Sequence, residues 1–396
     1  MKLLSILHRW TGAFIGFLLA LLGLSGALLV WKDQWISLPH ASDPLAENVG
    51  QIGRIVEAAG PGFSRVTFAH EENGLHHFVY GDGSGAYFSQ NGVLVDRWQS
   101  QWERPELWLF DFHHHLFAGD TGETVAGVTG IVGLVFVMTG LILWWRARRA
   151  TRLRLWPKRF APGPIVAHHR DLGLIASPLL LLSMLTGTMM LFEPIRSGIL
   201  GAEDRPKQEM AGPINPSVSQ ALAAAKAQFP DALLRRVVVP SEPGKPLTVR
   251  MRQPFEWTPN GRTQMSFAPD GKLTVDDAAS ANRSAGLGEK LYPLHSAKVG
   301  GLALKLAMTL SGLALAMLGS FTMWSFWARR SGRKIARKRA ARPQRPGQAA
   351  DLQLHHRPHS GRAECHPDRH RDHHHILGKR DEAERHIARS ADAGAF

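Results

Sequence analysis

The chain has 396 residues, of which 44% are hydrophobic and 20% are charged, and its formal net charge is +14. Its single cysteine, Cys365, excludes an intramolecular disulfide and any metal site held by cysteines. The mean hydropathy of −0.14 is that of a soluble basic protein, but it averages long uncharged stretches with very polar ones. Four of these stretches reach the ~20 apolar residues that a helix needs to cross a bilayer. A soluble protein is therefore excluded.

The apolar stretches predict four transmembrane helices, over residues 1–32, 111–146, 168–194 and 295–328. The first is too long for a cleaved signal peptide and lacks a small-residue cleavage site, so the alternative to a helix of the bundle is an uncleaved anchor. The fourth carries one charge, Lys305, close enough to its start for the amine to reach the headgroup region.

Basic residues beside these helices indicate the orientation of the chain, because Lys and Arg are retained on the cytoplasmic side. The loop 147–167 and the start of the tail 329–396 are strongly basic, whereas the stretch from residue 32 to residue 111 holds five basic residues against eleven acidic ones. We therefore expect both termini in the cytoplasm, with membrane lipid around the helices. The positive charge is then a signal of topology, and no nucleic-acid partner is expected.

The two long connections on the other side predict two small domains, over residues 33–110 and 195–294. Each contains a helix-like stretch followed by β-rich pieces that are separated by Gly, Asn and Pro turn signals. In the second, Ser217 precedes a run of good helix formers that Pro230 ends. Each segment therefore predicts a helix laid on a small antiparallel sheet.

The tail 329–396 differs in composition from the rest of the chain. After about residue 342 it holds nine His and many Arg with almost no apolar periodicity, which predicts a disordered segment. Histidine-rich tracts bind metal adventitiously. The abrupt change also fits a reading-frame artefact, and the sequence leaves open whether the tail has a function.

Two stretches of the chain repeat each other. Residues 8–26 read HRWTGAFIGFLLALLGLSG and residues 169–187 read HRDLGLIASPLLLLSMLTG, each with His-Arg at its start and Ser-Gly or Thr-Gly at its end. The second and fourth helices are each preceded by a His-containing segment and each end in Trp and Arg. The chain is therefore interpreted as two parallel repeats of two helices each, related by an axis along the membrane normal.

The repeat places histidines in two pairs. The inner pair is His8 and His169, at the cytoplasmic ends of the first and third helices, and the outer pair is His113 and His295, which precede the second and fourth. A histidine at a membrane boundary is often only an amphipathic side chain, but the duplication favours a shared role. Two imidazoles from facing helices are the axial ligands that a b-type haem needs, so we predict two haems. The residues alone do not decide among His113, His114 and His115.

The same stretches carry a family resemblance. HRWTGAFIGFLLALLGLSG, DFHHHLFAGDTGETVAGVTG with TGLILWW, HRDLGLIASPLLLLSMLTG and LYPLHSAKVGG resemble, in order, the membrane motifs of the PepSY-associated transmembrane family. Residues 215–240 and GKPLTVRMR are similar to a PepSY domain. The resemblance covers about residues 1–330. It implies an iron-regulated bacterial inner-membrane protein with PepSY-like periplasmic domains, from a family whose members include haem-containing reductases of ferric siderophores. It also favours His113 among its neighbours and His169 over His168.

The predicted fold class is thus an α-helical membrane protein with two small α+β domains, and the predicted function is that of an enzyme, a ferric-siderophore reductase. Electrons enter from a quinol or a cytoplasmic flavoprotein, because the chain has no nucleotide-binding fingerprint of its own. Arg9 and Arg170 are candidates to pair with haem propionates, or they only obey the positive-inside rule. The alternatives are a membrane anchor whose PepSY domains bind peptides or inhibit a protease, and a transporter of iron or siderophore. The acceptor's and donor's identities, the haem potentials and the oligomeric state stay open.

Overall fold

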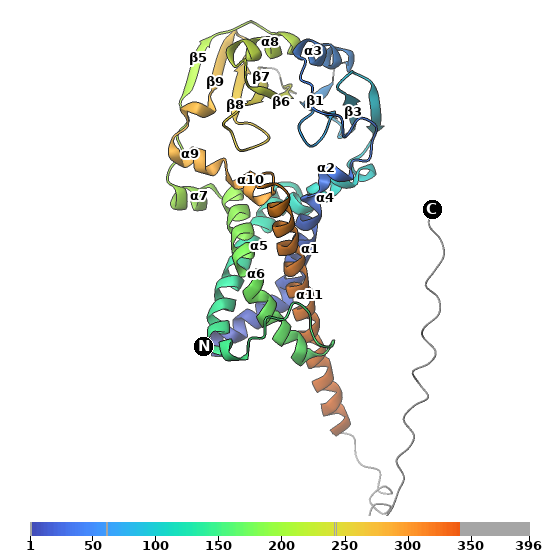
Figure 1. Cartoon of the computed structure of the whole chain (residues 1–396), viewed down its shortest axis with the longest axis vertical. Helices are drawn as coiled ribbons and strands as arrows, with labels where there is room; N and C mark the ends of the chain where they lie inside the picture. The colour runs from blue at the N-terminus through green and yellow to red at the C-terminus, as the bar shows by residue number, and fades with distance from the viewer. Residues whose placement is uncertain (1, 61, 241, 243, 341–396) are drawn as a thin grey trace, which may run out of the picture. The chain divides into compact units, whose positions relative to one another are not determined.

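The computed structural model describes residues 2–340, apart from residues 61, 241 and 243. Of these described residues, those up to Arg337 form one compact unit. Within it, four long helices lie below a β-sheet, and short helices connect the two layers (Figure 1).

The four long helices are α1 (Lys2–Leu29), α5 (Gly119–Ala147), α6 (Pro162–Leu191) and α11 (Gly301–Ala340). Each is long and apolar enough to cross a membrane, which agrees with the four transmembrane helices that the sequence predicts. Leu19, Leu180 and Leu318 form part of the core between these helices. Helix α11 continues to Ala340, so the first residues of the predicted tail 329–396 are helical. The remainder of that tail, with its nine histidines, lies outside the described residues.

The sheet has nine strands in the order β4-β3-β2-β1-β6-β7-β8-β9-β5, and each described pairing is antiparallel. The strands are β1 (Phe63–Thr67), β2 (Leu75–Tyr80), β3 (Gly85–Ser89), β4 (Leu94–Trp98), β5 (Lys207–Ala211), β6 (Leu233–Val238), β7 (Leu247–Arg252), β8 (Thr263–Phe267) and β9 (Lys272–Asp276). The helix α3 (Val49–Ala58) precedes β1, and α8 (Val218–Gln228) precedes β6. Each predicted segment thus contains the expected helix and antiparallel strands.

The two segments differ from the prediction in one respect, because they share a single sheet instead of forming separate domains. Strand β1 pairs with β6, with Val66 opposite Val237. Without this pairing, both strands would be sheet edges with unsatisfied N–H and C=O groups. The helices α3 and α8 cover the same side of the joined sheet, and Ile55 and Leu222 belong to one continuous core with strands from both segments. We call this joined unit the sheet domain.

The opposite side of the sheet faces the long helices. In β7, Leu247, Val249 and Met251 are buried towards α3 and α8, so the alternate residues point to this opposite side. Between the sheet and the long helices lie the short connecting helices (Figure 1). These are α2 (Lys32–Trp35), α4 (Pro105–His115), α7 (Glu193–Leu200), α9 (Arg283–Gly288) and α10 (Leu291–His295), and the chain also has the 3₁₀ turns η1 (Gln101–Glu103), η2 (Arg148–Ala150) and η3 (Ala278–Ser280).

Candidate functional site

The inner pair lies between α1 and α6, at the end of the bundle away from the sheet. The ring centroids of His8 and His169 are 6.2 Å apart, and the ring planes make an angle of 74°. Phe136 of α5 packs edge-on against His8 at a centroid distance of 5.3 Å. The structure therefore brings together the two histidines that the repeat predicts as a pair.

A hydroxyl group holds each imidazole of the inner pair. Thr139 Oγ1 lies 2.8 Å from His8 Nδ1, and Thr322 Oγ1 lies 2.8 Å from His169 Nδ1. Thr139 donates its own proton to the carbonyl of Val135 one turn earlier, at 2.7 Å, and Thr322 does the same within α11. Because each hydroxyl has one proton to donate, it accepts from the histidine, and we assign the Nδ1–H tautomer to both rings. The Nε2 lone pair of each ring is then available to a ligand.

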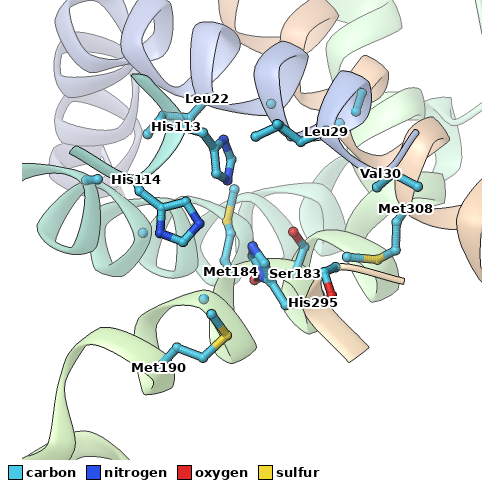
Figure 2. Close-up of a pocket in the computed structure, with 18 of the residues that line it drawn as sticks. Leu22, Leu29, Val30, His113, His114, Ser183, Met184, Met190, His295 and Met308 are labelled. Carbon is cyan, nitrogen blue, oxygen red and sulfur yellow. Dashed lines mark hydrogen bonds between the residues drawn. The ribbon is translucent and has the colours of Figure 1, made fainter. Parts of the chain in front are cut away.

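The outer pair lies at the sheet end of the bundle. His113 lies in the last turn of α4, which ends at His115, and His295 is the last residue of α10. Their ring centroids are 6.3 Å apart, and the ring planes make an angle of 41°. Figure 2 shows both rings pointing into one cavity beside Met184. The short helices α4 and α10 thus place two side chains at the top of the bundle that the transmembrane helices themselves do not supply.

The outer pair has the same hydroxyl arrangement. Ser25 Oγ lies 2.9 Å from His113 Nδ1, and Thr186 Oγ1 lies 3.1 Å from His295 Nδ1. Ser25 and Thr186 each bond to a carbonyl of their own helix, and His295 Nδ1 is also 3.0 Å from the Ser183 carbonyl. The same tautomer follows, with Nε2 available on both rings.

Glycines make room for the outer rings. A Cβ atom at Gly26 would lie 3.0 Å from His113 Cε1, and one at Gly187 would lie 2.9 Å from His295 Cε1. Any other residue at either position would therefore displace the ring. The Ser-Gly and Thr-Gly endings of the repeat thus combine a hydroxyl that holds a histidine with a glycine that admits it.

The positions of the hydroxyls were missed by the sequence analysis, although a signal was present. Ser25 follows His8 by 17 residues, and Thr186 follows His169 by 17 residues. At 1.5 Å per residue, this spacing separates the two histidine layers by about 26 Å along the helix axis. Helices α1 and α6 therefore each contribute a histidine to the inner pair and a hydroxyl to the outer pair.

The comparison with known families agrees with this architecture. The family model described as PepSY-associated TM region matches residues 5–330, which include the whole sheet domain, all of α5 and α6, and most of α1 and α11. The chain belongs to this family. No curated protein matches it. This PepSY-associated TM chain is accordingly a multi-pass membrane protein.

The neighbouring histidines of this PepSY-associated TM chain have other contacts. His168 is 1% exposed, and its Nε2 lies 3.1 Å from the carbonyl of Leu155 in the loop 147–167. His114 stacks on Phe110 at a centroid distance of 4.2 Å, and it also lines the cavity of the outer pair. His115 Nδ1 is 3.9 Å from Glu123. The structure therefore pairs His113 and His169, and not their neighbours, with the opposite histidine.

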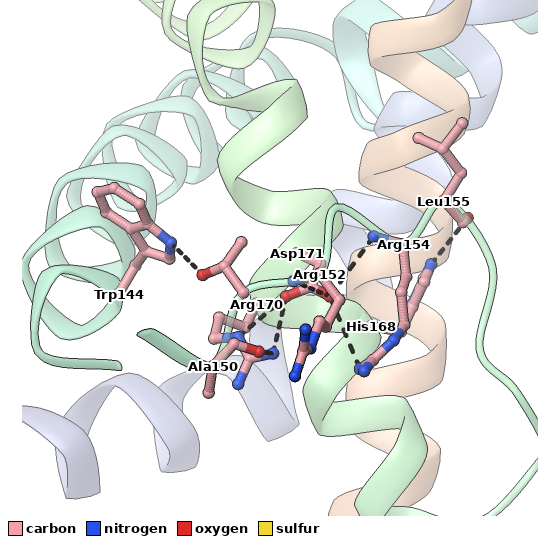
Figure 3. Close-up of polar contacts among 9 residues, drawn as sticks. Trp144, Ala150, Arg152, Arg154, Leu155, His168, Arg170 and Asp171 are labelled. Carbon is pink, nitrogen blue, oxygen red and sulfur yellow. Dashed lines mark hydrogen bonds and ion pairs between the residues drawn. The ribbon is translucent and has the colours of Figure 1, made fainter. Parts of the chain in front are cut away.

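The two arginines beside the inner pair have different surroundings. Arg9 is exposed. Arg170 bonds to Asp171 Oδ1 at 2.8 and 2.9 Å and to the carbonyl of Ala150 at 2.5 Å (Figure 3). Asp171 is fully buried and also accepts from the backbone N–H groups of Arg152 and Arg154. In this arrangement Arg170 fixes the basic loop to α6, and its role towards a propionate stays a prediction.

The cavity of the outer pair is mostly apolar. Its wall comes from α1, α5, α6 and α11, and Leu22, Met184 and Met308 are among its residues (Figure 2). Lys298, at its rim, bonds to Asp33 at 2.5 Å and also to Glu72. In the part of the chain that the structure describes, no three His, Cys, Asp or Glu side chains converge on a point that could hold a bare metal ion. The histidine pairs can thus supply two ligands to a metal whose other ligands come from elsewhere.

Proposed function

We propose that this chain is a di-haem electron-transfer protein of the inner membrane that reduces ferric iron in a periplasmic siderophore. One b-type haem binds between His8 and His169, and the other binds between His113 and His295. The observation that supports this most strongly is that all four rings have Nδ1 bonded and Nε2 free, in two facing pairs.

The distance between the rings fits a haem. An iron atom is about 2 Å from each axial nitrogen, and each nitrogen is about 1 Å from its ring centroid, which gives about 6 Å between two axial imidazoles. The centroid distances of 6.2 and 6.3 Å match this value. A haem also supplies the four equatorial nitrogens that the protein does not provide, so two histidines suffice.

The chain's own residues have three roles in this proposal. The Ser and Thr hydroxyls fix the tautomer and orientation of the rings and raise the basicity of Nε2, as second-shell groups do at metal sites. The apolar side chains of the bundle exclude water. The helices α1 and α6 set the spacing of the two layers. A bound haem supplies reversible one-electron chemistry, and two of them divide a membrane span that one could not cover.

The reduction matches the chemistry of iron chelation. A siderophore binds Fe(III) far more tightly than Fe(II), so the transfer of one electron to the iron weakens its hold without destroying the chelator. The electron comes from a quinol or a cytoplasmic flavoprotein, which is oxidised by the same amount. We place the loop 147–167 in the cytoplasm because of its arginines, and the sheet domain in the periplasm. Reporter fusions at Gly83 and Gly244 test this topology, and cytoplasmic signals from them would contradict it.

The function is tested by spectroscopy on the purified chain. A di-haem protein is red with a b-type Soret band, whereas a peptide-binding anchor or a simple transporter is colourless. Replacement His8→Ala should stop reduction from the cytoplasmic side but leave the outer haem reducible by dithionite and re-oxidisable by a ferric siderophore in stopped flow. If the remaining haem transfers no electron to any ferric chelate while the wild type does, the outer haem is not the exit site.

A further inference from the structure

Arginines gather on the side of the sheet that faces the long helices. Arg236 of β6 and Arg250 of β7 are direct cross-strand partners, and Arg65 lies on the neighbouring strand β1. Like charges in directly opposite positions destabilise a sheet. Burial and then the charges of Arg65 and Arg250 lower the pKa of Arg236 to about 10. The strand pairing thus holds together positive charges that repel one another.

The same group of charges extends into a cleft beside α10. Two of the arginines that line this cleft, Arg250 and Arg262, come from the sheet and the β7–β8 loop, and the other two, Arg196 and Arg205, come from α7 and the segment after it. One acidic residue, Glu203, is among the described lining residues. The pKa of Arg250 is lowered by burial and then by the charges of Arg262 and Arg205. We call the cleft that is lined by Arg196, Arg205, Arg250 and Arg262 the arginine cleft.

The charges of the arginine cleft are only partly compensated. Arg196 pairs with Glu203 at 2.8 Å, and Arg205 pairs with Glu289 at 3.0 Å. Arg250 has a weak bond to the neutral amide of Gln264 at 3.3 Å. The structure describes the side chains of residues 2–332, apart from 61, 241 and 243. Among these, no carboxylate lies within ion-pair distance of four arginines, namely Arg65, Arg236, Arg250 and Arg262. In this part of the chain the Nε group of Arg262, which lines the cleft, and that of Arg236, on strand β6 beside it, are buried without an acceptor. Buried donors without acceptors are costly, so the cleft is suited to a ligand that brings anionic oxygens.

The arginine cleft adjoins the outer histidine pair. Tyr292 and Met190 line both the arginine cleft and the cavity of His113 and His295. Tyr292 is also one turn before His295 in α10. A ligand in the cleft is therefore separated from the outer pair by few side chains.

From this juxtaposition we infer that the arginine cleft binds an anionic ferric chelate, one in which catecholate or carboxylate oxygens hold the iron and leave the complex negatively charged. The inference rests on the proposed function and narrows its substrate class. Guanidinium groups present planar forks of N–H donors that match such oxygens. A chelate of three hydroxamates is neutral with Fe(III), and it lacks the charge that the cleft requires.

Binding can be measured separately from electron transfer, with Ga(III) in place of Fe(III). Ga(III) has the same charge and a similar size but is not reduced by haem. Titration calorimetry on the full-length haem-loaded chain in detergent would use gallium tris-catecholate, which is a trianion, and a neutral gallium trihydroxamate. We expect the trianion to bind at least about tenfold more tightly, and its affinity to fall with added salt.

Matched variants locate the binding site. Arg250→Gln and Arg262→Gln should each weaken binding of the trianion by about tenfold or more, because each removes a charge-assisted hydrogen bond. Arg54→Gln removes the same charge from an exposed position on α3, across the sheet from the cleft, and it should leave the affinity unchanged. The Soret band of all three variants should match that of the wild type.

Besides exclusive binding of neutral chelates, three results would overturn the inference. These are equal affinities for the two gallium complexes, an equal loss of affinity in Arg54→Gln, and a loss of haem from Arg250→Gln, which would mean that the arginines serve a propionate. If the trianion binds as expected but a ferric tris-catecholate does not re-oxidise the reduced haem, the proposed function fails and the binding site stands. If only neutral chelates bind and are reduced, the proposed function stands and this inference fails.

Discussion

Replacement of Thr139 by Val tests the hydroxyl that holds the inner pair. The substitution keeps the β-branched shape and removes the acceptor that lies 2.8 Å from His8 Nδ1. The Nδ1–H group then has no acceptor in the apolar bundle, and the ring is free to rotate. We therefore expect a weaker inner haem site, with the outer site unchanged because its hydroxyls lie about 26 Å away along the helices.

The magnitude follows from the single hydrogen bond that is lost. Loss of a second-shell partner typically costs 10–100-fold in metal affinity, so haem should leave the inner site about 10–100-fold faster. The bond also favours the ferric state, because it raises the basicity of the imidazole. If the whole net value of the bond, about 1 kcal/mol, favoured the ferric state, its loss would raise the potential of the inner haem by about 40 mV, so we expect an upward shift of no more than about 40 mV.

The assay combines haem transfer to an acceptor protein with a redox titration of each haem. Thr129→Val is the matched control, because Thr129 lies on the same helix and its hydroxyl bonds only to the Val125 carbonyl, at 2.7 Å. Thr139→Ser, which keeps the hydroxyl, should have the wild-type rate of haem loss and the wild-type potentials. Equal haem loss from Thr139→Val and Thr129→Val, without a shift in either potential, would refute the assigned role of the hydroxyl.

Three further predictions concern groups outside the histidine pairs. Asp171→Asn should loosen the basic loop from α6 by about 1.5–3 kcal/mol, since the fully buried carboxylate accepts a charged hydrogen bond from Arg170, and faster tryptic cleavage within residues 151–160 would reveal it. Burial lowers the pKa of His76 to about 4, so below pH 6.5 the unfolded state binds a proton that the folded state does not, and stability falls as the pH decreases. In unfolding experiments the wild type should lose about 2 kcal/mol at pH 5 relative to His76→Gln. Parallel curves of stability against pH for the two proteins would contradict this. Lys298→Met should lower the melting temperature, because it leaves Asp33 buried without its partner at a cost of about 3–5 kcal/mol, and a further Asp33→Asn change should recover part of the loss.

The transmembrane helices and the histidine pairs were predictable because their signals are local or duplicated. A bilayer fixes the length of an apolar helix, so composition alone locates α1, α5, α6 and α11. His8 and His169 occupy equal positions in a repeat, which identifies them as partners without any knowledge of the fold. The structure places their rings 6.2 Å apart, as the pairing requires.

Other features depend on contacts between distant parts of the chain. The pairing of β1 with β6 joins residues about 170 positions apart, and no local pattern specifies which edge strand meets which. The hydroxyl of Thr139 bonds to its own helix, as Ser and Thr in helices commonly do, so the sequence does not distinguish it from Thr129. The arginine cleft likewise forms only when β7 and α7 come together.

The central claim is that the four histidines form two haem sites, each shared between two helices. Reduced-minus-oxidised spectra of single His→Ala variants, with haem content measured per chain, test it most directly. Replacement of His8 or of His169 should remove the same half of the haem, with the same spectral component, and replacement of His113 or of His295 should remove the other half. Losses that pair His8 with His295, or full haem content in any of the four variants, would contradict the account.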